Sequence, residues 1–100
     1  MTRTFILSPA AKQDLRDILH YKAEYDIDYA FDFVDKLVER FKETLSAFPE
    51  SGSVYEGDVR KIAFEGYTAF YTIEAAPESI DILRIVDLGK PLKERGIEFN

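Results

Sequence analysis

The chain has 100 residues, of which 46% are hydrophobic and 14% aromatic, and its net charge at pH 7 is −6. This hydrophobic content excludes a disordered chain, and the length is typical of one domain, so we expect a single domain over residues 1–100. The absence of cysteine excludes disulfides, thiolate metal sites and thiol nucleophiles. No apolar run is long enough to cross a bilayer, so we expect a cytoplasmic protein with no membrane partner.

The negative charge is concentrated in the first part of the chain. Residues 1–58 contain seven basic and twelve acidic side chains, whereas residues 59–100 contain six and seven. An acidic protein repels phosphate backbones at long range. We therefore expect no direct binding of nucleic acid by the chain on its own.

The first predicted elements are a short strand and a helix. Residues 3–7 (RTFIL) form a short segment whose residues favour a strand, and Ser8 followed by Pro9 is typical of a helix N-cap and first helical position. The side chains expected on the packed face of this helix recur at helical spacing. They are Ala11, Leu15, Ile18, Leu19 and Tyr25.

A second helix is predicted from Asp28, which can act as its N-cap, to Pro49, which cannot continue it. Its apolar residues form one broad stripe with acidic residues opposite. The stripe consists of Ala30, Phe33, Val34, Leu37, Val38, Phe41, Leu45 and Phe48. The segment from Glu50 to Gly52 is predicted as loop.

From Val59 onward the period of the pattern changes from 3.6 to 2, which indicates strands. Residues 59–64 and 67–73 are predicted to form a hairpin that turns at Glu65-Gly66, and the apolar run 80–86 is predicted to be an interior strand. The expected fold is α+β, in the order β-α-α-β-β-β. It has a small antiparallel sheet with an N-terminal strand, a two-helix hairpin packed on one face and a C-terminal three-strand meander. Residues 88–100 form a C-terminal tail.

The order of these segments resembles the RelE/ParE superfamily of toxins from type II toxin–antitoxin systems over about residues 4 to 90. The resemblance lies in LSPAAKQDLRDI, a helix that ends in FPESG, and the strands VRKIAF, GYTAFYTI and IDILRIVDLGK. It implies an α+β toxin that a cognate antitoxin holds inactive until the antitoxin is degraded. It also implies one of two targets, because RelE-like toxins cut mRNA in the ribosome whereas ParE-like toxins inhibit DNA gyrase.

Several positions distinguish the two branches and favour the ParE-like one. Arg60 and Lys61 match the family's basic strand residues, and Lys90 matches the position after the last strand. Thr68, however, occupies the place of an arginine in the ribonuclease branch. Asp87 stands where ParE-like chains usually have histidine, so the chain departs from the ParE-like pattern at this position.

The candidate contacts to a target or to RNA are Arg60, Lys61, Arg84, Lys90, Lys93 and Arg95, with Tyr67 and Tyr71 as supporting aromatic residues. No residue is singled out as catalytic. Each candidate also has a structural interpretation. Arg84 can pair with a carboxylate, Arg60 and Lys61 can be solvated charges on an edge strand and point to opposite faces, and the two tyrosines can be core residues.

The remaining polar residues predict no cofactor and no metal site. His20 is the only histidine and is expected on the solvent face of the first helix, and a lone histidine without cysteine does not make a transition-metal site. The acidic stripe opposite the core of the second helix could bind a hard cation or imitate DNA, but it also fits a solvated helix face. That stripe consists of Asp32, Asp35, Glu39 and Glu43.

Three functions follow as hypotheses. The first is an inhibitor-type toxin that acts on DNA gyrase or another protein and is not an enzyme. The second is a ribosome-dependent, metal-independent endoribonuclease. The third is an inert relative that still binds an antitoxin.

Overall fold

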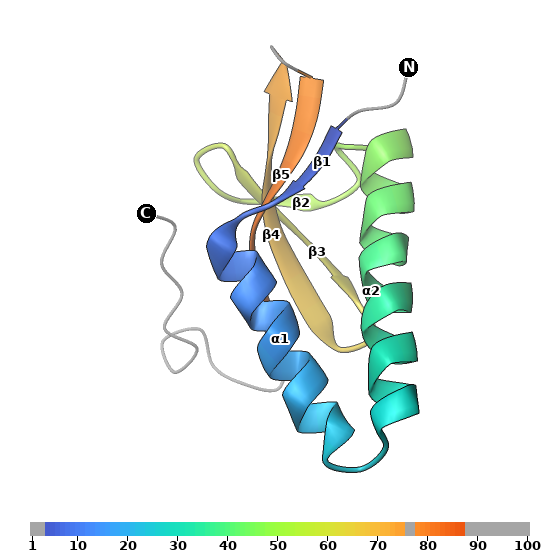
Figure 1. The fold of residues 1–100 in the computed structure, drawn as a ribbon. Coiled ribbons are helices and arrows are strands. Elements are labelled where there is room, and N and C mark those ends of the chain that lie inside the picture. The colour runs from blue at the N-terminus through green and yellow to red at the C-terminus, as the bar shows by residue number, and fades with distance from the viewer. Residues whose placement is uncertain (1–3, 76–77, 88–100) are drawn as a thin grey trace.

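The computed structural model describes residues 4–75 and 78–87 of the chain. The elements, in chain order, are β1 (Thr4–Leu7), α1 (Pro9–Ala23), α2 (Ile27–Ala47), β2 (Ser53–Glu56), β3 (Val59–Phe64), β4 (Tyr67–Ala75) and β5 (Glu78–Asp87). The strands form one sheet in the order β1-β5-β4-β3-β2. Both helices lie on the same face of this sheet, and α1 and α2 form an antiparallel hairpin (Figure 1).

The α+β class, the helix hairpin and the three-strand meander are confirmed, and the sheet adds two features to the prediction. β1 pairs with β5 in parallel, so the sheet is mixed. The segment from Glu50 to Gly52 is loop, as predicted, and the edge strand β2, where no element was predicted, follows it and pairs antiparallel with β3. A four-residue strand is too short for its alternating pattern to be recognised in the sequence. β2 forms because β3 supplies its hydrogen-bond partners.

α1 begins as predicted, with Ser8 as N-cap and Pro9 in the first turn. The Ser8 hydroxyl accepts a hydrogen bond from Ala11 N–H at 3.0 Å. The buried residues Ala11, Leu15 and Ile18 confirm the predicted face. Tyr25 is an exception, because α1 ends at Ala23 and the Tyr25 side chain is 78% exposed.

α2 is capped two residues earlier than predicted. Asp26 accepts a hydrogen bond from Tyr29 N–H at 3.1 Å, whereas Asp28 lies in the first turn, where its charge favours the helix dipole. Ala30, Leu37, Phe41 and Leu45 are buried, as the periodicity predicts. The prediction was wrong for Phe48, which lies past the last helical residue and is 70% exposed.

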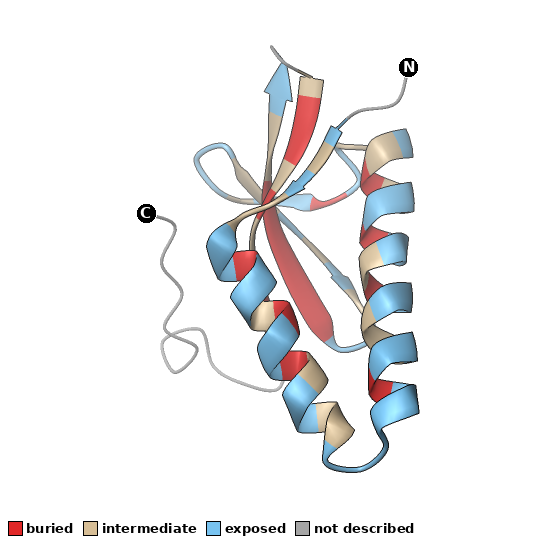
Figure 2. Cartoon of the chain, viewed as in Figure 1, coloured by how far each residue is buried: buried red, intermediate tan, exposed pale blue. Residues whose placement is uncertain are grey.

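The hairpin of β3 and β4 turns at Glu65 and Gly66, as predicted. Both residues have positive φ angles, 54° and 86°, as a two-residue turn between twisted strands requires. Tyr67, Ala69 and Tyr71 of β4 face the helices and belong to the core together with Ile80, Ile82 and Ile85 of β5. Figure 2 shows this buried region between the helices and the sheet.

β5 contains a β-bulge that the sequence did not predict. Tyr71 pairs with Ile82 and Phe70 pairs with Arg84, so Leu83 is the extra residue. The bulge keeps both Ile82 and Ile85 in the core, although strict alternation would place only one of them there. Arg84 therefore lies on the opposite side of the strand from Ile80 and Ile82, although strict alternation along the sequence predicts that the three share a face.

Candidate functional site

Arg84 binds Asp14 of α1. Its Nε and Nη2 atoms donate to the two carboxylate oxygens of Asp14 at 2.8 and 2.9 Å, and Ile85 N–H donates to the same carboxylate at 2.9 Å. The side chains of Arg84 and Asp14 are only 17% and 12% exposed. This bidentate pair holds α1 against the bulge, in agreement with the structural interpretation of Arg84.

Ser8 joins the same region from the start of α1. Its N–H donates to the Ile82 carbonyl at 2.9 Å, and its hydroxyl donates to the Leu83 carbonyl at 2.8 Å. Ser8 thus caps α1 and also donates hydrogen bonds to two carbonyl groups at the bulge in β5. The first two turns of α1 and the middle of β5 are therefore fixed relative to each other by polar contacts on both sides of Leu83.

Arg60 and Tyr71 lie together on the helix side of the sheet, where the loop after α2 crosses the strands. The Tyr71 hydroxyl donates to the Pro49 carbonyl at 2.8 Å and accepts from Gly52 N–H at 3.1 Å. Arg60 Nη1 donates to the Gly52 carbonyl at 2.9 Å. Burial raises the pKa of Tyr71 above the usual tyrosine value, while the hydrogen bond from Gly52 and the charge of Arg60 act in the opposite direction.

Lys61 points to the other face of the sheet, as alternation predicts. Its register partner is Phe70, and its ammonium lies 5.8 Å from the centre of the Tyr55 ring. The prediction that Arg60 and Lys61 protect an edge strand was wrong, because β3 lies between β4 and β2. Lys61 is nevertheless exposed.

Tyr67 is the first residue of β4 and lies beside the end of the helix hairpin, away from Arg60. The Lys22 ammonium of α1 is 4.1 Å from the centre of the Phe33 ring and 5.8 Å from the centres of the Tyr67 and Tyr29 rings. Phe33 packs edge-to-face on Tyr67 with ring centres 5.8 Å apart. Burial raises the pKa of Tyr67, and the Asp87 carboxylate adds to the increase.

The predicted site residues therefore occupy separate places and do not converge on one cavity. Arg60 and Tyr71 are beside the loop after α2, Tyr67 is at the hairpin end, and Lys61 and Arg84 are on the opposite face of the sheet, on either side of Phe70. Lys90, Lys93 and Arg95 lie outside the described residues. Tyr67 and Tyr71 are both buried, as their structural interpretation predicted.

Metal-free RNA cleavage needs a general base, a general acid and cations around one phosphate. Residues 4–75 and 78–87 contain no such cluster of the candidate side chains, and within the same ranges no group of acidic or histidine side chains is arranged to hold a metal. Thr68, where the ribonuclease branch has arginine, is buried between its register partners Ala63 and Val86. This position offers no charge to a phosphate.

Two open grooves lie near the β2 end of the sheet. The larger has a volume of about 680 Å³ and is lined by Ala47, Phe48, Pro49, Glu50, Ser51 and Ile73. The smaller, of about 250 Å³, is more polar and includes Arg60, Asp58 and Glu74. Among the candidate site residues that the structure describes, only Arg60 lines either of these grooves.

A cluster of exposed apolar residues at the end of the helix hairpin was missed by the sequence analysis. Its members are 52–78% exposed, and they are Tyr21, Tyr25, Ile27, Tyr29 and Phe31. The available signal was their number, since eleven consecutive residues contain more aromatic side chains than one buried helix stripe can accommodate. Periodicity alone had assigned Tyr25 to the core.

Comparison with known proteins gives the family. Residues 5–89 match the sequence profile of the ParE toxins of type II toxin–antitoxin systems, encoded by parDE. Because the match covers most of the chain, this protein belongs to the ParE toxin family and is a type II toxin. The sequence matches none of the curated proteins compared with it.

Solved structures support the same fold. The chain is similar to a protein of the chromosomal ParDE toxin–antitoxin system from Pseudomonas aeruginosa, with a TM-score of 0.72, 22% identity, and coverage of 87% of this chain and 97% of the other. It is also similar to a chain of the RelBE2 toxin–antitoxin complex from Mycobacterium tuberculosis. There the TM-score is 0.68, the identity 18%, and the coverage 87% and 92%.

Neither helix of the described part of the chain combines the length and the apolar character that a membrane span requires.

Proposed function

We propose that this toxin acts by binding and inhibiting a protein target, DNA gyrase, and that a cognate antitoxin neutralises it in the cytoplasm. The observation that carries the choice of target is the dispersal of Arg60, Lys61, Arg84, Tyr67 and Tyr71 over three separate places on both faces of the sheet. A toxin that binds a protein needs a surface, whereas a ribonuclease needs these groups around one phosphate. The ParE family membership supports the same choice.

The charge of the chain supports a protein target as well. A net charge of −6 opposes binding to ribosomal RNA and mRNA, because each phosphate contact has to be made against the long-range repulsion of the whole protein. The buried Thr68 removes one cation that the ribonuclease branch has at that place.

The antitoxin partner is proposed from the relatives. The P. aeruginosa relative comes from a ParDE toxin–antitoxin system, and the M. tuberculosis relative was solved as a toxin–antitoxin complex. A protein with this fold and an exposed apolar surface is suited to a partner that covers part of it until release.

Within this proposal, the basic residues that contact the target are Lys61 and the tail residues Lys90, Lys93 and Arg95. Arg60 and Arg84 already donate to Gly52 and Asp14, so we assign them mainly to holding the fold. Tyr67 and Tyr71 support these regions from the core and do not touch the target.

The test is induction of the toxin in bacteria without its antitoxin, followed by measurement of growth, mRNA integrity and plasmid supercoiling. The expected result is growth arrest with loss of negative supercoiling and intact mRNA. A triple variant, Lys90→Gln with Lys93→Gln and Arg95→Gln, should relieve the arrest. The charge-matched control is the triple variant Lys12→Gln with Arg16→Gln and Lys42→Gln, on the exposed sides of the helices.

Codon-positioned mRNA cleavage with normal supercoiling would overturn the gyrase target in favour of the endoribonuclease. Normal growth despite folded, abundant toxin would favour the inert relative. Purification with a co-expressed antitoxin separates the partner from the target, because the antitoxin complex should form whichever target is correct.

A further inference from the structure

The end of the helix hairpin combines exposed aromatic side chains with acidic charge. Tyr21, in the last turn of α1, and Tyr25, in the turn after it, are stacked edge-to-face with ring centres 6.1 Å apart, and both are exposed to solvent. Tyr29, at the start of α2, is 52% exposed and packs on Phe33 at 6.0 Å. We call Tyr21, Tyr25 and Tyr29 the tyrosine surface.

The tyrosine surface is continuous with the core through Lys22 and Tyr67. The Lys22 ammonium lies against the rings of Tyr29, Phe33 and Tyr67, so its positive charge is directed inward onto aromatic faces. Among the described residues Lys22 forms no ion pair with a carboxylate. These contacts fix the platform from which the three tyrosines project.

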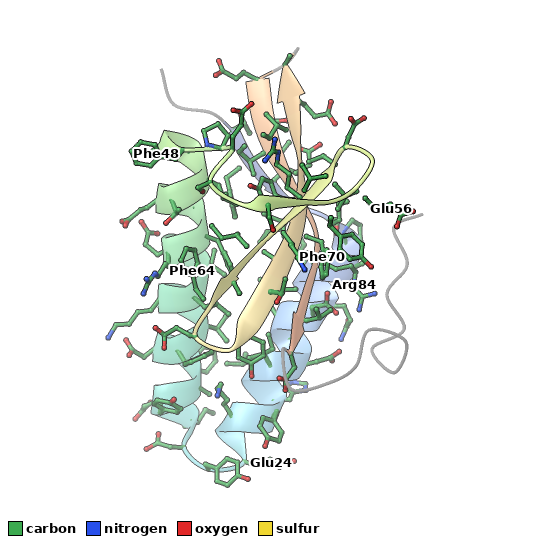
Figure 3. The ribbon with its side chains drawn as sticks, turned by 180° about the vertical axis from the view of Figure 1, so that it is seen from behind. Glu24, Phe48, Glu56, Phe64, Phe70 and Arg84 are labelled. Carbon is green, nitrogen blue, oxygen red and sulfur yellow. The ribbon has the colours of Figure 1, made fainter. Side chains whose placement is uncertain are left out.

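The charges around the tyrosine surface are predominantly negative. Residues 21–35 contain Lys22 as their one basic residue and five acidic residues, a balance of −4. Within the described part of the chain, Asp32 of this group is paired with Lys36 at 3.0 Å, whereas Glu24 and Asp28 are exposed and form no ion pair. Glu24 projects at the very end of the hairpin in Figure 3.

We propose that this end of the molecule is a docking surface for a basic segment of a protein partner. The tyrosine rings pack against aliphatic and guanidinium groups of that segment, and Glu24 and Asp28 lie opposite its positive charges. Exposed tyrosines supply large contact area at small entropic cost and bind both apolar groups and cations. The acidic rim attracts a basic segment and repels nucleic acid or an acidic peptide. A second copy of this chain would bring an equally acidic rim and would be repelled.

The proposal goes beyond the choice of target, since it concerns the chemistry of a second surface. This surface lies at the other end of α2 from Phe48, which is marked in Figure 3 together with Glu24. Phe48 is likewise an exposed aromatic residue and lines the larger groove. It provides a matched control for exposed aromatic area without the surrounding acidic charge of the hairpin end.

The test is a titration of the full-length toxin with a synthetic amphipathic peptide of lysine, arginine and leucine, followed by amide chemical shifts and calorimetry. The control peptide has glutamate in place of both basic residues. The expected result is binding of the basic peptide, with shift changes concentrated at residues 21–29. The double variant Tyr25→Ser with Tyr29→Ser should weaken binding about tenfold, as loss of central aromatic contacts does.

The charge contribution is tested separately. Glu24→Gln with Asp28→Asn should weaken binding several-fold and reduce its dependence on salt, whereas Phe48→Ser should change neither. Asp26 is left intact because it caps α2. Since every substituted side chain is exposed, circular dichroism should show unchanged folding in all variants.

Four results would overturn the proposal. One is equal binding of the glutamate peptide, and another is a set of shift changes centred on the Phe48 groove. The third is concentration-dependent self-association in sedimentation that the tyrosine double variant abolishes, since this would assign the surface to a second copy. Duplex DNA serves as a further probe, and its binding at residues 21–29 would equally contradict a basic protein partner.

Discussion

At the scale of single residues, polar side chains determine how α1 and the loop after α2 attach to the sheet. Asp14 accepts three hydrogen bonds from β5, and the Tyr71 hydroxyl bridges two backbone groups of the loop. Within residues 4–75 and 78–87, neither side chain is near a cluster that could perform chemistry on a substrate. Both act by satisfying groups that would otherwise be desolvated without partners.

Asp14→Ala should destabilise the protein strongly. The substitution leaves the Arg84 guanidinium and Ile85 N–H without their acceptor in a largely buried position, and we expect a loss of about 2 to 3 kcal/mol in the free energy of unfolding. Urea denaturation measures this loss. Asp17→Ala is the control, because Asp17 is exposed and receives only a hydrogen bond from Gln13. A change for Asp14→Ala as small as that for Asp17→Ala would contradict the role of the pair.

Tyr71 should make the stability depend on alkaline pH. Its pKa is raised in the folded protein, so the folded state holds the phenol proton more tightly than the unfolded state. The stabilisation is complete below the ordinary tyrosine pKa of about 10 and is lost as the pH rises above it. As the pH rises above this value, each tyrosine with a raised pKa lowers the free energy of unfolding by at most about 1.4 kcal/mol per pH unit.

The measurement is urea denaturation at increasing pH for the wild type and Tyr71→Phe. The variant should have a shallower decline above pH 10, although Tyr67, whose pKa is also raised, retains part of it. Tyr55→Phe is a control for the loss of a hydroxyl, because the Tyr55 side chain is only partly buried whereas Tyr71 is fully buried. Identical declines in the wild type and Tyr71→Phe would show that Tyr71 titrates normally.

At the scale of elements, the passage from α2 to β2 depends on one close approach of the backbone. A Cβ atom on Gly52 would lie 2.5 Å from the Tyr71 hydroxyl oxygen and 2.6 Å from the Lys61 carbonyl oxygen. Gly57 and Gly66 have open space around them and need glycine for a different reason, their positive φ angles of 54° and 86°.

Gly52→Ala should therefore cost more than Gly57→Ala. We expect a loss of about 3 kcal/mol for Gly52→Ala, because backbone atoms and the tyrosine hydroxyl have to move apart, against about 1 kcal/mol of backbone strain for Gly57→Ala. Thermal denaturation of the two variants gives the comparison. If Gly52→Ala is combined with Tyr71→Phe, removal of the hydroxyl should relieve part of the loss. A Gly52→Ala variant as stable as Gly57→Ala would contradict the close approach.

Elements with a clear hydrophobic period could be predicted from the sequence. The errors arise where contacts between residues distant in sequence determine the local structure. The helix start at Ser8, the turn at Glu65-Gly66 and the core positions of β4 are encoded locally by capping, turn chemistry and alternation. The bulge at Leu83 depends on Asp14, some 70 residues away in sequence. Tyr25 and Phe48 continue the apolar pattern of their helices but lie just beyond the helix ends, where no partner covers them.

The candidate site was less predictable than the fold. Sequence spacing correctly separated Arg60 and Lys61 onto opposite faces, and burial of Tyr67 and Tyr71 followed from alternation. Which of the basic side chains lie close together, however, depends on the strand order and on the pairing of Arg84 with Asp14 of α1. The tyrosine surface arises because the end of the helix hairpin has no partner within the described chain, and this is a property of the assembled fold.

At the scale of the whole molecule, stability should be distributed unevenly across the sheet. β4 and β5 are paired on both sides and contribute most of the fully buried residues, whereas β2 is a short edge strand with mostly exposed side chains. Hydrogen exchange should therefore be slowest for the paired amides of β4 and β5. It should be fastest in β2 and at the end of the helix hairpin, where opening exposes little apolar surface. Amides of β2 that exchange as slowly as those of β4 would contradict this distribution.

The bulge in β5 also determines which changes of chain length the strand can tolerate. Because Leu83 and Arg84 together stand opposite Phe70, loss of one of these two residues would leave Ile80, Ile82 and Ile85 on the side of the sheet that they occupy now. Loss of a residue between Ser79 and Ile82 would instead shift the register of the strand by one residue on one side of the deletion. The isoleucines on that side would then lie on the face away from the helices. When relatives of this toxin differ by one residue in their last strand, the gap in the alignment should therefore fall at Leu83 or Arg84.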